Sequence, residues 1–368
     1  MIVIKQLSDI RMRVGQLLLM GFDGAEMSGR LRSTLASLQP GGIILFARNI
    51  QSPRQTYDLV HECQKALAVL AFRCVDLEGG TVDRMRNVIA PAPAAADVFA
   101  SGDRGLYRSH GRILGEETRT LGFNVDFAPV FDLAFAPSRP VLTTRPVSAD
   151  PKKTVVYCRE FLRGLKSAGV LGCGKHFPGL GEANLDTHQE LPQIAKPWKR
   201  LWNEDLYPYR VLRREIAFVM AAHAGYPDVT RDSIPATLSK KWLSEILRKK
   251  VGYHGLIMAD DLEMGGVLAA ASIEDAAIGT LEAGSDIFPV CHNEDKVWQA
   301  YEAVLSRAER DRKFARLVAE RARRVMQFKR RSREMKRSAP PPTDKAIDIL
   351  RRRLEKLSEQ VRAAAVAM

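Results

Sequence analysis

Short apolar runs alternate along the chain with longer stretches in which apolar residues recur with the period of a helix. Eight runs have the length of a buried strand, and they cover residues 17–22, 43–46, 71–75, 125–130, 170–174, 218–222, 256–259 and 286–290. Amphipathic stretches lie between them, for example at 53–69, 105–121, 154–167, 240–251 and 273–283. Strand alternating with helix eight times is typical of a (β/α)8 barrel, which needs about 250 residues. We therefore predict an α/β fold, with a single (β/α)8 TIM-type barrel domain in residues 1–330.

A charged residue or a histidine follows every predicted strand. These residues are Asp23, Arg48, Asp76, Asp132, Lys175 with His176, His223, Asp260 and His292. The carboxyl ends of barrel strands converge on one face, where the active sites of such barrels lie. The pattern therefore predicts one polar pocket, built from residues that are far apart in the sequence.

The pattern changes after residue 320. A basic segment at 331–343 contains three consecutive prolines, which break helices and predict a linker. The following segment, 344–368, carries apolar residues at helical spacing: Ile347, Leu350, Leu354, Leu357 and Val361. We expect one amphipathic helix as a C-terminal basic extension, docked on the barrel or on a second subunit. Self-association through this helix is therefore an open alternative.

The net charge of the 368-residue chain is +13, and most of the excess lies near the C-terminus. Residues 321–362 contain fifteen Lys or Arg and five Asp or Glu, a net of +10. A basic tail with few aromatic residues is typical of a solvated helix. We therefore do not expect nucleic-acid binding, and attraction to an acidic surface or a nucleic acid is the alternative.

Composition indicates a globular protein with a sizeable core, since 46% of the residues are hydrophobic and 27% are charged. No apolar run approaches the roughly 18 residues that cross a bilayer, and the run at 17–20 is too short for the core of a signal peptide. We predict no membrane span and a cytoplasmic location. The five cysteines show no CxxC spacing, which favours reduced, buried thiols over disulfides or a zinc site.

The densest group of chemically active residues lies between positions 175 and 188. The fifth predicted strand is followed by Lys175 and His176 and then by a Pro-Gly break, so both polar side chains fall at the barrel mouth. Asp186 lies two residues before His188, and a carboxylate at this spacing can orient an imidazole for general acid–base catalysis. Metal binding by His176 and His188 is the alternative, although their spacing matches no standard site.

Two further segments carry charged residues that suit a polyhydroxylated ligand. Asp260 ends the seventh predicted strand, and its neighbour Asp261 is expected to cap the next helix. Asp76 ends the third strand, while Arg84 and Arg145 are candidate partners for the same pocket. Carboxylates accept hydrogen bonds from vicinal hydroxyls and guanidinium groups donate to them. A surface ion pair is the alternative for either arginine.

These motifs resemble the signature of family 3 glycoside hydrolases, specifically the bacterial β-N-acetylhexosaminidases of the NagZ type. The matching segments are 41–49 (GGIILFARN), 76–84 (DLEGGTVDR), 124–130 (NVDFAPV), 175–181 (KHFPGLG), 186–188 (DTH), 222–223 (AH) and 260–264 (DDLEM). They occur in order over most of the predicted barrel, so the resemblance is specific.

The resemblance implies retaining hydrolysis of terminal β-linked N-acetylglucosamine from peptidoglycan-derived muropeptides. It implies that Asp260 is the nucleophile of a double displacement, and that His188, oriented by Asp186, is the acid/base. It implies that the sugar ring is held by Asp76, Arg84, Arg145, Lys175 and His176. It also implies that the reaction needs no metal ion or organic cofactor.

Some details differ from the family pattern. Leu180 stands where the family commonly has His, and Arg145 is followed by Pro-Val where Ser-Phe is expected. None of these differences removes a residue assigned to the chemistry. Two other functions stay open. One is a β-N-acetylglucosaminide phosphorylase with the same Asp and His residues, because a neutral imidazole does not repel phosphate. The other is a catalytically inactive sugar-binding protein.

Overall fold

The structure is a computed structural model that describes residues 9–366, so predictions that concern residues 1–8, Ala367 and Met368 lie outside the described part. Eight parallel strands form its centre: β1 Leu18–Met20, β2 Gly42–Ile44, β3 Phe72–Val75, β6 Val125–Asp126, β7 Leu171–Phe177, β8 Phe218–Ala221, β9 Leu256–Ala259 and β10 Phe288–Val290. Each of them overlaps one of the eight apolar runs. The structure therefore confirms the predicted α/β class and the number of strands.

The eight strands form a nearly closed barrel. They pair in the order β10-β1-β2-β3-β6-β7-β8-β9, and every pair is parallel. β9 and β10 stand at the two ends of this order. A parallel bridge between Met258 of β9 and Ile287, the residue before β10, connects them. The backbone N–H of Asp286 also donates to the carbonyl of Ile257 at 2.7 Å. These contacts complete the TIM-type arrangement that the alternation predicts.

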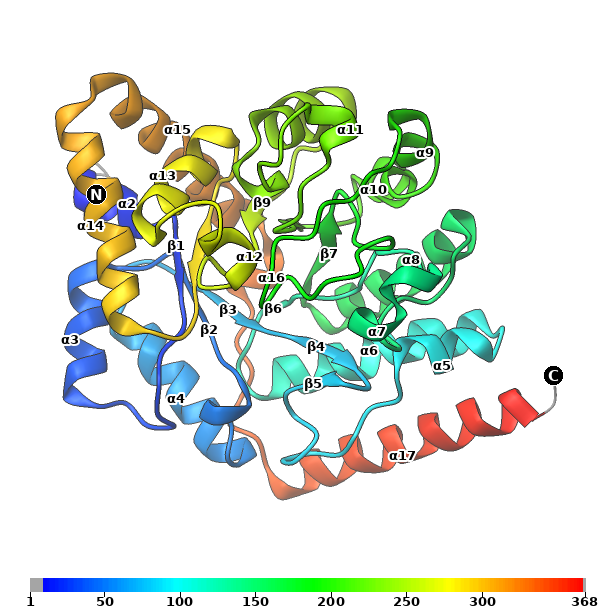
Figure 1. Ribbon diagram of the computed structural model, residues 1–368. Helices are drawn as coiled ribbons and strands as arrows, with labels where there is room; N and C mark the ends of the chain where they lie inside the picture. Colours follow the sequence, from blue (N-terminus) through cyan, green and yellow to red (C-terminus); the bar gives the residue numbers. More distant parts are fainter. Residues whose placement is uncertain (1–8, 367–368) are drawn as a thin grey trace.

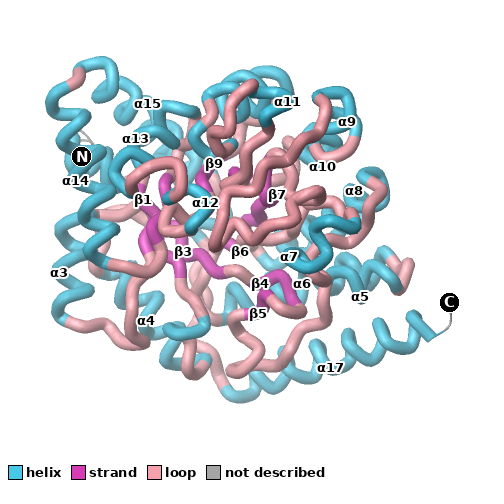
Figure 2. The backbone as a smooth tube through the Cα atoms, in the orientation of Figure 1, coloured by secondary structure: helices cyan, strands magenta, loops and turns pink. Residues whose placement is uncertain are grey.

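Helices surround the barrel on its outside (Figures 1 and 2). The longer helices are α3 Gly29–Leu38, α4 Pro53–Lys65, α6 Arg104–Thr120, α8 Pro151–Ala168, η4 Lys241–Lys250, α13 Ile273–Ala283, α14 Glu294–Arg310, α15 Arg312–Arg331 and α17 Asp344–Val366. The shorter helices are α2 Ile10–Gly15, η1 Ala47–Asn49, α5 Ala95–Ala100, η2 Ala136–Ser138, α7 Arg139–Leu142, α9 Trp198–Asn203, α10 Leu206–Leu212, α11 Pro227–Thr230, η3 Ala236–Leu238, α12 Gly265–Leu268 and α16 Arg333–Lys336. Every amphipathic stretch picked out from the sequence contains a helix.

Local sequence explains where several helices begin and end. The hydroxyl of Ser52 accepts from the N–H of Gln55, the Gln55 side chain accepts from the N–H of Ser52, and Pro53 opens α4. At the far end of α8, Gly169 adopts a left-handed φ of 80° that turns the chain into β7.

A small hairpin, β4 Leu77–Gly79 and β5 Val82–Asp83, leaves the carboxyl end of β3. Gly79 and Gly80 make its turn with φ values of 83° and 61°, which residues with a Cβ rarely adopt. The apolar pattern does not predict this hairpin because its strands are too short to show alternation.

The amino-terminal end of the barrel is closed by α15. Phe328 on this helix packs against Phe72 and Phe218, with ring centroids 6.1 and 5.7 Å apart. The adjacent Lys329 is buried and donates to the carbonyl of Gly41 at 2.7 Å and to Oε1 of Gln16 at 2.9 Å. Both acceptors lie just before barrel strands, so this end is filled and the opposite end is left for a pocket.

The C-terminal helix α17 docks on the outside of the barrel, one of the two arrangements expected. Its apolar face is buried against the body, with five residues at most 6% exposed: Ile347, Leu350, Leu354, Leu357 and Val361. The helix packs against α5 and α6 and runs along one side of the molecule (Figure 1, red). Within the segment expected to be a linker, α16 forms a single turn whose Met335 is buried.

The described residues bear on two expectations from composition. All five cysteines are buried and free. None of the helices in residues 9–366 is long and apolar enough to span a membrane.

Candidate active site

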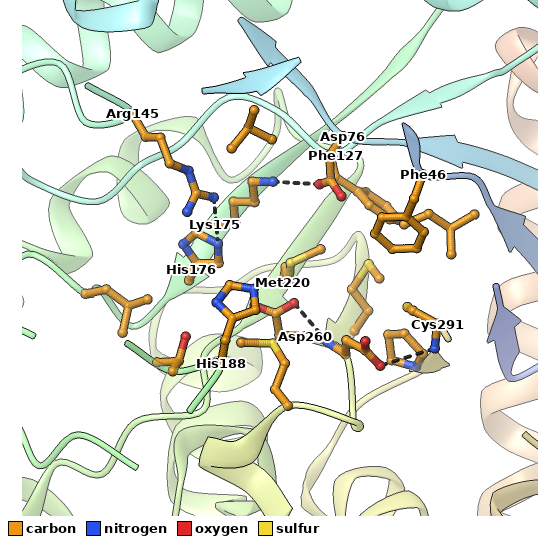
Figure 3. Close-up of a pocket in the computed structure, with 18 of the residues that line it drawn as sticks. Phe46, Asp76, Phe127, Arg145, Lys175, His176, His188, Met220, Asp260 and Cys291 are labelled. Atoms are coloured by element: carbon orange, nitrogen blue, oxygen red, sulfur yellow. Dashed lines mark hydrogen bonds and ion pairs between the residues drawn. The ribbon is translucent and has the colours of Figure 1, made fainter. Parts of the chain in front are cut away.

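One pocket opens at the carboxyl ends of the barrel strands. It is lined by all eight residues that the sequence suggests for a site: Asp76, Arg84, Arg145, Lys175, His176, Asp186, His188 and Asp260. Apolar side chains complete its wall, including Phe46, Phe127, Met220 and Met258. Figure 3 shows the labelled polar side chains directed into the same space, namely Asp76, Arg145, Lys175, His176, His188 and Asp260. The structure therefore brings together every residue that the motifs assign to the pocket. The strand-end pattern is only partly correct, because Asp23, Arg48, Asp132 and His223 follow strands but do not line this pocket.

Two cations and two carboxylates form a buried network on one side of the pocket. The Nζ atom of Lys175 lies 2.8 Å from Oδ1 of Asp76 and 2.6 Å from Oε1 of Glu78. The guanidinium of Arg145 grips the same Glu78 carboxylate through Nε at 2.8 Å and Nη2 at 2.9 Å. Such paired, parallel bonds fix both partners in one geometry. The arginine is thus part of a buried ion pair and not of a surface one.

The network sets the charges of its members. Burial alone would raise the pKa of Glu78, but Arg145 and Lys175 overcome this effect and hold that pKa well below its usual range. Burial would lower the pKa of Lys175, yet Asp76 and Glu78 raise it above the usual value. Glu78 and Lys175 therefore stay ionised at neutral pH, and they present fixed charges to a ligand.

His176 is held by the carboxylate of Asp132, which lies in the loop after the neighbouring strand β6. Its Nδ1 lies 2.6 Å from Oδ2 of Asp132, and its Nε2 lies 3.3 Å from Nη2 of Arg145. Because a guanidinium can only donate, Nε2 accepts from Arg145 and the proton lies on Nδ1, facing Asp132. The N–H of Leu180 also donates to Asp132, at 2.7 Å. Asp132 therefore fixes the orientation of a ring that lines the pocket.

Asp260 directly follows β9 and directs its carboxylate into the pocket (Figure 3). Its Oδ1 accepts from the backbone N–H of Asp261 at 2.9 Å. Burial raises the pKa of Asp260, but the hydrogen bond from the N–H of Asp261 and the positive charge of Lys175 oppose burial, and the pKa lies below its usual value. The group is thus an anion at neutral pH, as an attacking carboxylate must be.

Asp186 and His188 lie on the long loop after β7, and both side chains are open to solvent, with 42% and 69% exposed. Nδ1 of His188 lies 2.7 Å from Oδ1 of Asp186. Burial raises the pKa of Asp186, but the bonds from His188 to its carboxylate prevail and lower it. His188 and Asp260 line the same pocket although they come from separate segments (Figure 3).

The loop that carries His188 is fastened to the segment that follows Asp260. The N–H of Gly265 donates to the carbonyl of His188 at 2.9 Å, and the N–H of Gly266 donates to the carbonyl of Thr187 at 3.0 Å. A Cβ on Gly265 would lie 2.4 Å from the carbonyl oxygen of Gln189, so the close approach requires a glycine. These bonds fix the position of the His188 loop relative to the segment that carries Asp260.

The sequence predicted that Asp261 caps the next helix, and this prediction is wrong. That helix, α12, starts at Gly265, and Asp261 instead accepts from the N–H groups of Glu263 and Cys291. Asp261, Glu263 and His292 offer ligand atoms within 4.8 Å of one another, a spacing that could hold a metal ion. The carboxylates also bind backbone N–H groups, which gives them a structural role in joining the two strand ends.

Some residues of the site have no role in the sequence-based prediction. Glu78 links Lys175 to Arg145, and the motif around it suggested at most a weak phosphate cradle. Asp132 and His223 follow strands, a signal that places them near the pocket but does not indicate what they bind. His223 is buried beside Asp260, with Nε2 2.9 Å from the carbonyl oxygen of Asp261.

Comparison with known families identifies the chain. Its sequence matches the family described as Glycosyl hydrolase family 3 N terminal domain over residues 9–328. The chain belongs to glycoside hydrolase family 3. The match confirms the resemblance of the motifs, and this family 3 member is a glycoside hydrolase.

Relatives of this family 3 chain cover most of its length. It is 34% identical to a β-hexosaminidase of Alkalilimnicola ehrlichii over 290 residues, which are 76% of this chain and 82% of the relative. A family 3 β-N-acetylglucosaminidase from Paenibacillus sp. str. FPU-7 has a similar structure, with a TM-score of 0.88, 31% identity, and coverage of 96% of this chain and 69% of that chain. Native NagZ from Neisseria gonorrhoeae gives a TM-score of 0.75 and 27% identity, over 95% of this chain and 97% of that chain.

Proposed function

We propose that this glycoside hydrolase is a retaining exo-β-N-acetylglucosaminidase that works by double displacement. The observation that carries the proposal is that Asp260 and the Asp186–His188 pair, from separate segments, line one pocket. The names of the relatives support the choice of sugar, because they include β-hexosaminidases and a β-N-acetylglucosaminidase.

In the first step, a carboxylate oxygen of Asp260 attacks the anomeric carbon while the bond to the leaving oxygen breaks. His188 gives its Nε2 proton to that oxygen, so that the aglycone leaves as a neutral alcohol. The products are a covalent glycosyl ester on Asp260 and a neutral imidazole on His188.

In the second step, Nε2 of His188 takes a proton from water, and the water oxygen attacks the anomeric carbon. The ester bond to Asp260 breaks, which releases the sugar and restores the carboxylate and the protonated imidazole. Asp186 keeps Nδ1 of His188 in a hydrogen bond at 2.7 Å, so that Nε2 faces the reaction in both steps. A histidine replaces one of the two carboxylates of the common mechanism and can transfer protons near neutral pH.

The charged side chains of the pocket are suited to bind a sugar ring through hydrogen bonds. We assign this binding role to Asp76, Arg84, Arg145, Lys175 and His176, which line the pocket beside Asp260. Carboxylate oxygens accept from ring hydroxyls, and the cations donate to hydroxyl or acetamido oxygens. The family resemblance extends the proposal to muropeptide fragments with terminal N-acetylglucosamine, hydrolysed in the cytoplasm without a metal or organic cofactor.

Turnover of 4-nitrophenyl β-N-acetylglucosaminide by wild type and by Asp260→Asn tests the proposal. We expect wild type to release the sugar with retained anomeric configuration, which NMR of the first product detects. Asp260→Asn should lose at least about a thousandfold in kcat, because the amide cannot form the glycosyl ester. Asp97→Asn, an exposed residue on α5, is the matched control and should keep full activity.

Three results contradict the proposal in different ways. Equal rates for wild type and Asp260→Asn reject the nucleophile. N-acetylglucosamine 1-phosphate as the main product in phosphate buffer indicates phosphorolysis of the same bond. Binding of N-acetylglucosamine without any turnover by wild type indicates an inactive sugar-binding protein.

A further inference from the structure

The loop that carries Arg84 is closed at its base and covered on its outside by the C-terminal helix. Residues 84–91, here called the Arg84 loop, follow the hairpin β4–β5. The two carboxylate oxygens of Asp83 accept from the N–H groups of Met85 at 3.0 Å and Ala92 at 2.9 Å. The N–H of Gly80 donates to the carbonyl of Ala92 at 3.0 Å. The base of the loop is thereby fixed, and its outer part needs other contacts.

Arg84 reaches the pocket without a charged partner. Among the described residues its guanidinium makes no ion pair, and its Nε atom is buried without a hydrogen bond. Its guanidinium carbon lies 5.7 Å from the centre of the Phe46 ring. Arg145, in contrast, is fixed by two bonds to Glu78. The position of Arg84 therefore depends on the backbone of its own loop.

Helix α17 contacts the outer part of the Arg84 loop. Nε of Arg351 donates to the carbonyl of Ile89 at 3.1 Å, and the Ile89 side chain is buried. Further along, residues 90–93 face the last turns of α17 across a shared crevice. Figure 1 shows the segment between β5 and α5 running against this helix.

The helix itself is anchored to the barrel independently of the loop. Leu354 and Leu357 are buried, and α17 packs along α6 and α5. Arg353 forms an ion pair with Glu116 of α6. Because α6 belongs to the barrel, α17 gives the loop a fixed support on the side away from the pocket.

We propose that α17 is a positioning element of the active site, which holds the Arg84 loop through Arg351 and thereby sets the affinity of the pocket for the sugar. The inference rests on the proposed function, since it assumes that Arg84 binds the substrate. Arg351 touches no reacting atom and acts through the backbone at Ile89. It should therefore affect binding more than the chemical step.

Arg351→Ala tests the proposal. Loss of one hydrogen bond to the loop should raise KM for the chromogenic N-acetylglucosaminide by about threefold to tenfold, with kcat changed less than about twofold. Binding of free N-acetylglucosamine, measured by calorimetry, should weaken by the same factor. Arg352→Ala removes an exposed arginine from the same helix and should leave both values unchanged.

A double-mutant cycle separates positioning from general stability. In an Arg84→Ala background, Arg351→Ala should have no further effect on KM, because the residue that the loop positions is already absent. Hydrogen exchange of peptides that cover residues 84–91 should be faster in Arg351→Ala than in Arg352→Ala. Arg351→Lys, which keeps a donor, should recover part of the affinity.

The outcomes distinguish this inference from the proposed function. Equal KM values for wild type and Arg351→Ala, with normal turnover, overturn the positioning role and leave the hydrolase intact. Additive effects of Arg84→Ala and Arg351→Ala also overturn it, since the two residues would then act separately. No turnover by wild type would contradict the proposed function, and the calorimetric binding data would still test the role of α17.

Discussion

Glu78 is a buried carboxylate held between two cations, Lys175 and Arg145. A buried charge is costly unless it is paired, and removal of one partner leaves the others uncompensated. Glu78 therefore matters both to the stability of the chain and to the placement of two residues that line the pocket.

Glu78→Gln should lower the free energy of unfolding by about 3–5 kcal/mol, because the substitution leaves an excess of buried positive charge. Urea unfolding followed by circular dichroism measures the effect at neutral pH. Glu309→Gln, at an exposed position, is the control and should change stability by less than about 0.5 kcal/mol. A neutral result for Glu78→Gln would show that Lys175 and Arg145 find other partners.

The same comparison has a predicted pH dependence. The pKa of folded Glu78 lies below its ordinary value of 4.5, so its contribution is fully present above that value. It is lost as the pH falls below 4.5, because protons then bind the unfolded chain more tightly than the folded one. The difference in stability between wild type and Glu78→Gln should therefore shrink in acid.

The connection between the two catalytic segments depends on the backbone at the start of α12. Gly265 and Gly266 bind the carbonyls of His188 and Thr187, and these bonds hold the loop after β7 against the segment after β9. Since no side chain makes this contact, its strength depends on how closely the two backbones approach.

Gly265→Ala should displace the loop, because the added Cβ would lie 2.4 Å from the carbonyl oxygen of Gln189. We expect kcat to fall by about tenfold to a hundredfold, since a shift of about 1 Å in a catalytic group has this effect. Gly29→Ala is the matched control, because a Cβ there meets nothing within 4 Å. Steady-state kinetics of both variants provide the test, and equal kcat values would show that the loop needs no such contact.

At the level of strands and helices, most of the fold follows from periodicity. The runs at 17–22 and 256–259 are predicted as strands and form β1 and β9, while 273–283 is predicted as a helix and forms α13. The hairpin β4–β5 escapes prediction because two and three residues are too few to show a period. It is held instead by glycines in its turn and by contacts of Glu78 with distant residues.

The barrel as a whole is filled at its amino-terminal end by α15, and one of the filling groups is an amine. Burial lowers the pKa of Lys329 from 10.5 to about 7, and among residues 9–366 the amine has carbonyl acceptors but no carboxylate partner. The folded chain therefore binds this proton less tightly than the unfolded chain does. Its unfavourable contribution is present below pH 7 and disappears as the pH rises toward 10.5.

Lys329→Met should accordingly gain stability relative to wild type most strongly at pH 7 and below. The gain should decline by up to about 1.4 kcal/mol per pH unit above pH 7. In this range the folded wild type releases the proton of Lys329, so that burial of the amine costs less free energy. Urea unfolding of both proteins between pH 6 and 9.5 measures this slope. Lys313→Met, at an exposed position, should show no comparable dependence, and a flat difference for Lys329→Met would contradict the pKa of the buried amine.

The sequence by itself determined the order of strands and helices and the residues that follow each strand. This is because periodicity and turn residues act locally, and a barrel always brings its strand ends to one face. Asp260, Lys175 and His188 could therefore be assigned to one pocket without coordinates. Their catalytic and binding roles came from the family resemblance and remain proposals.

Only the tertiary structure decided which of these groups meet. The bonds of Glu78 to Lys175 and Arg145, of Asp132 to His176, and of Arg351 to Ile89 join residues far apart in the chain. Such pairings depend on barrel closure and on the docking of α17, which set distances to within a few tenths of an ångström. Residue types and spacing do not predict those distances, because each charged group could have paired with several others.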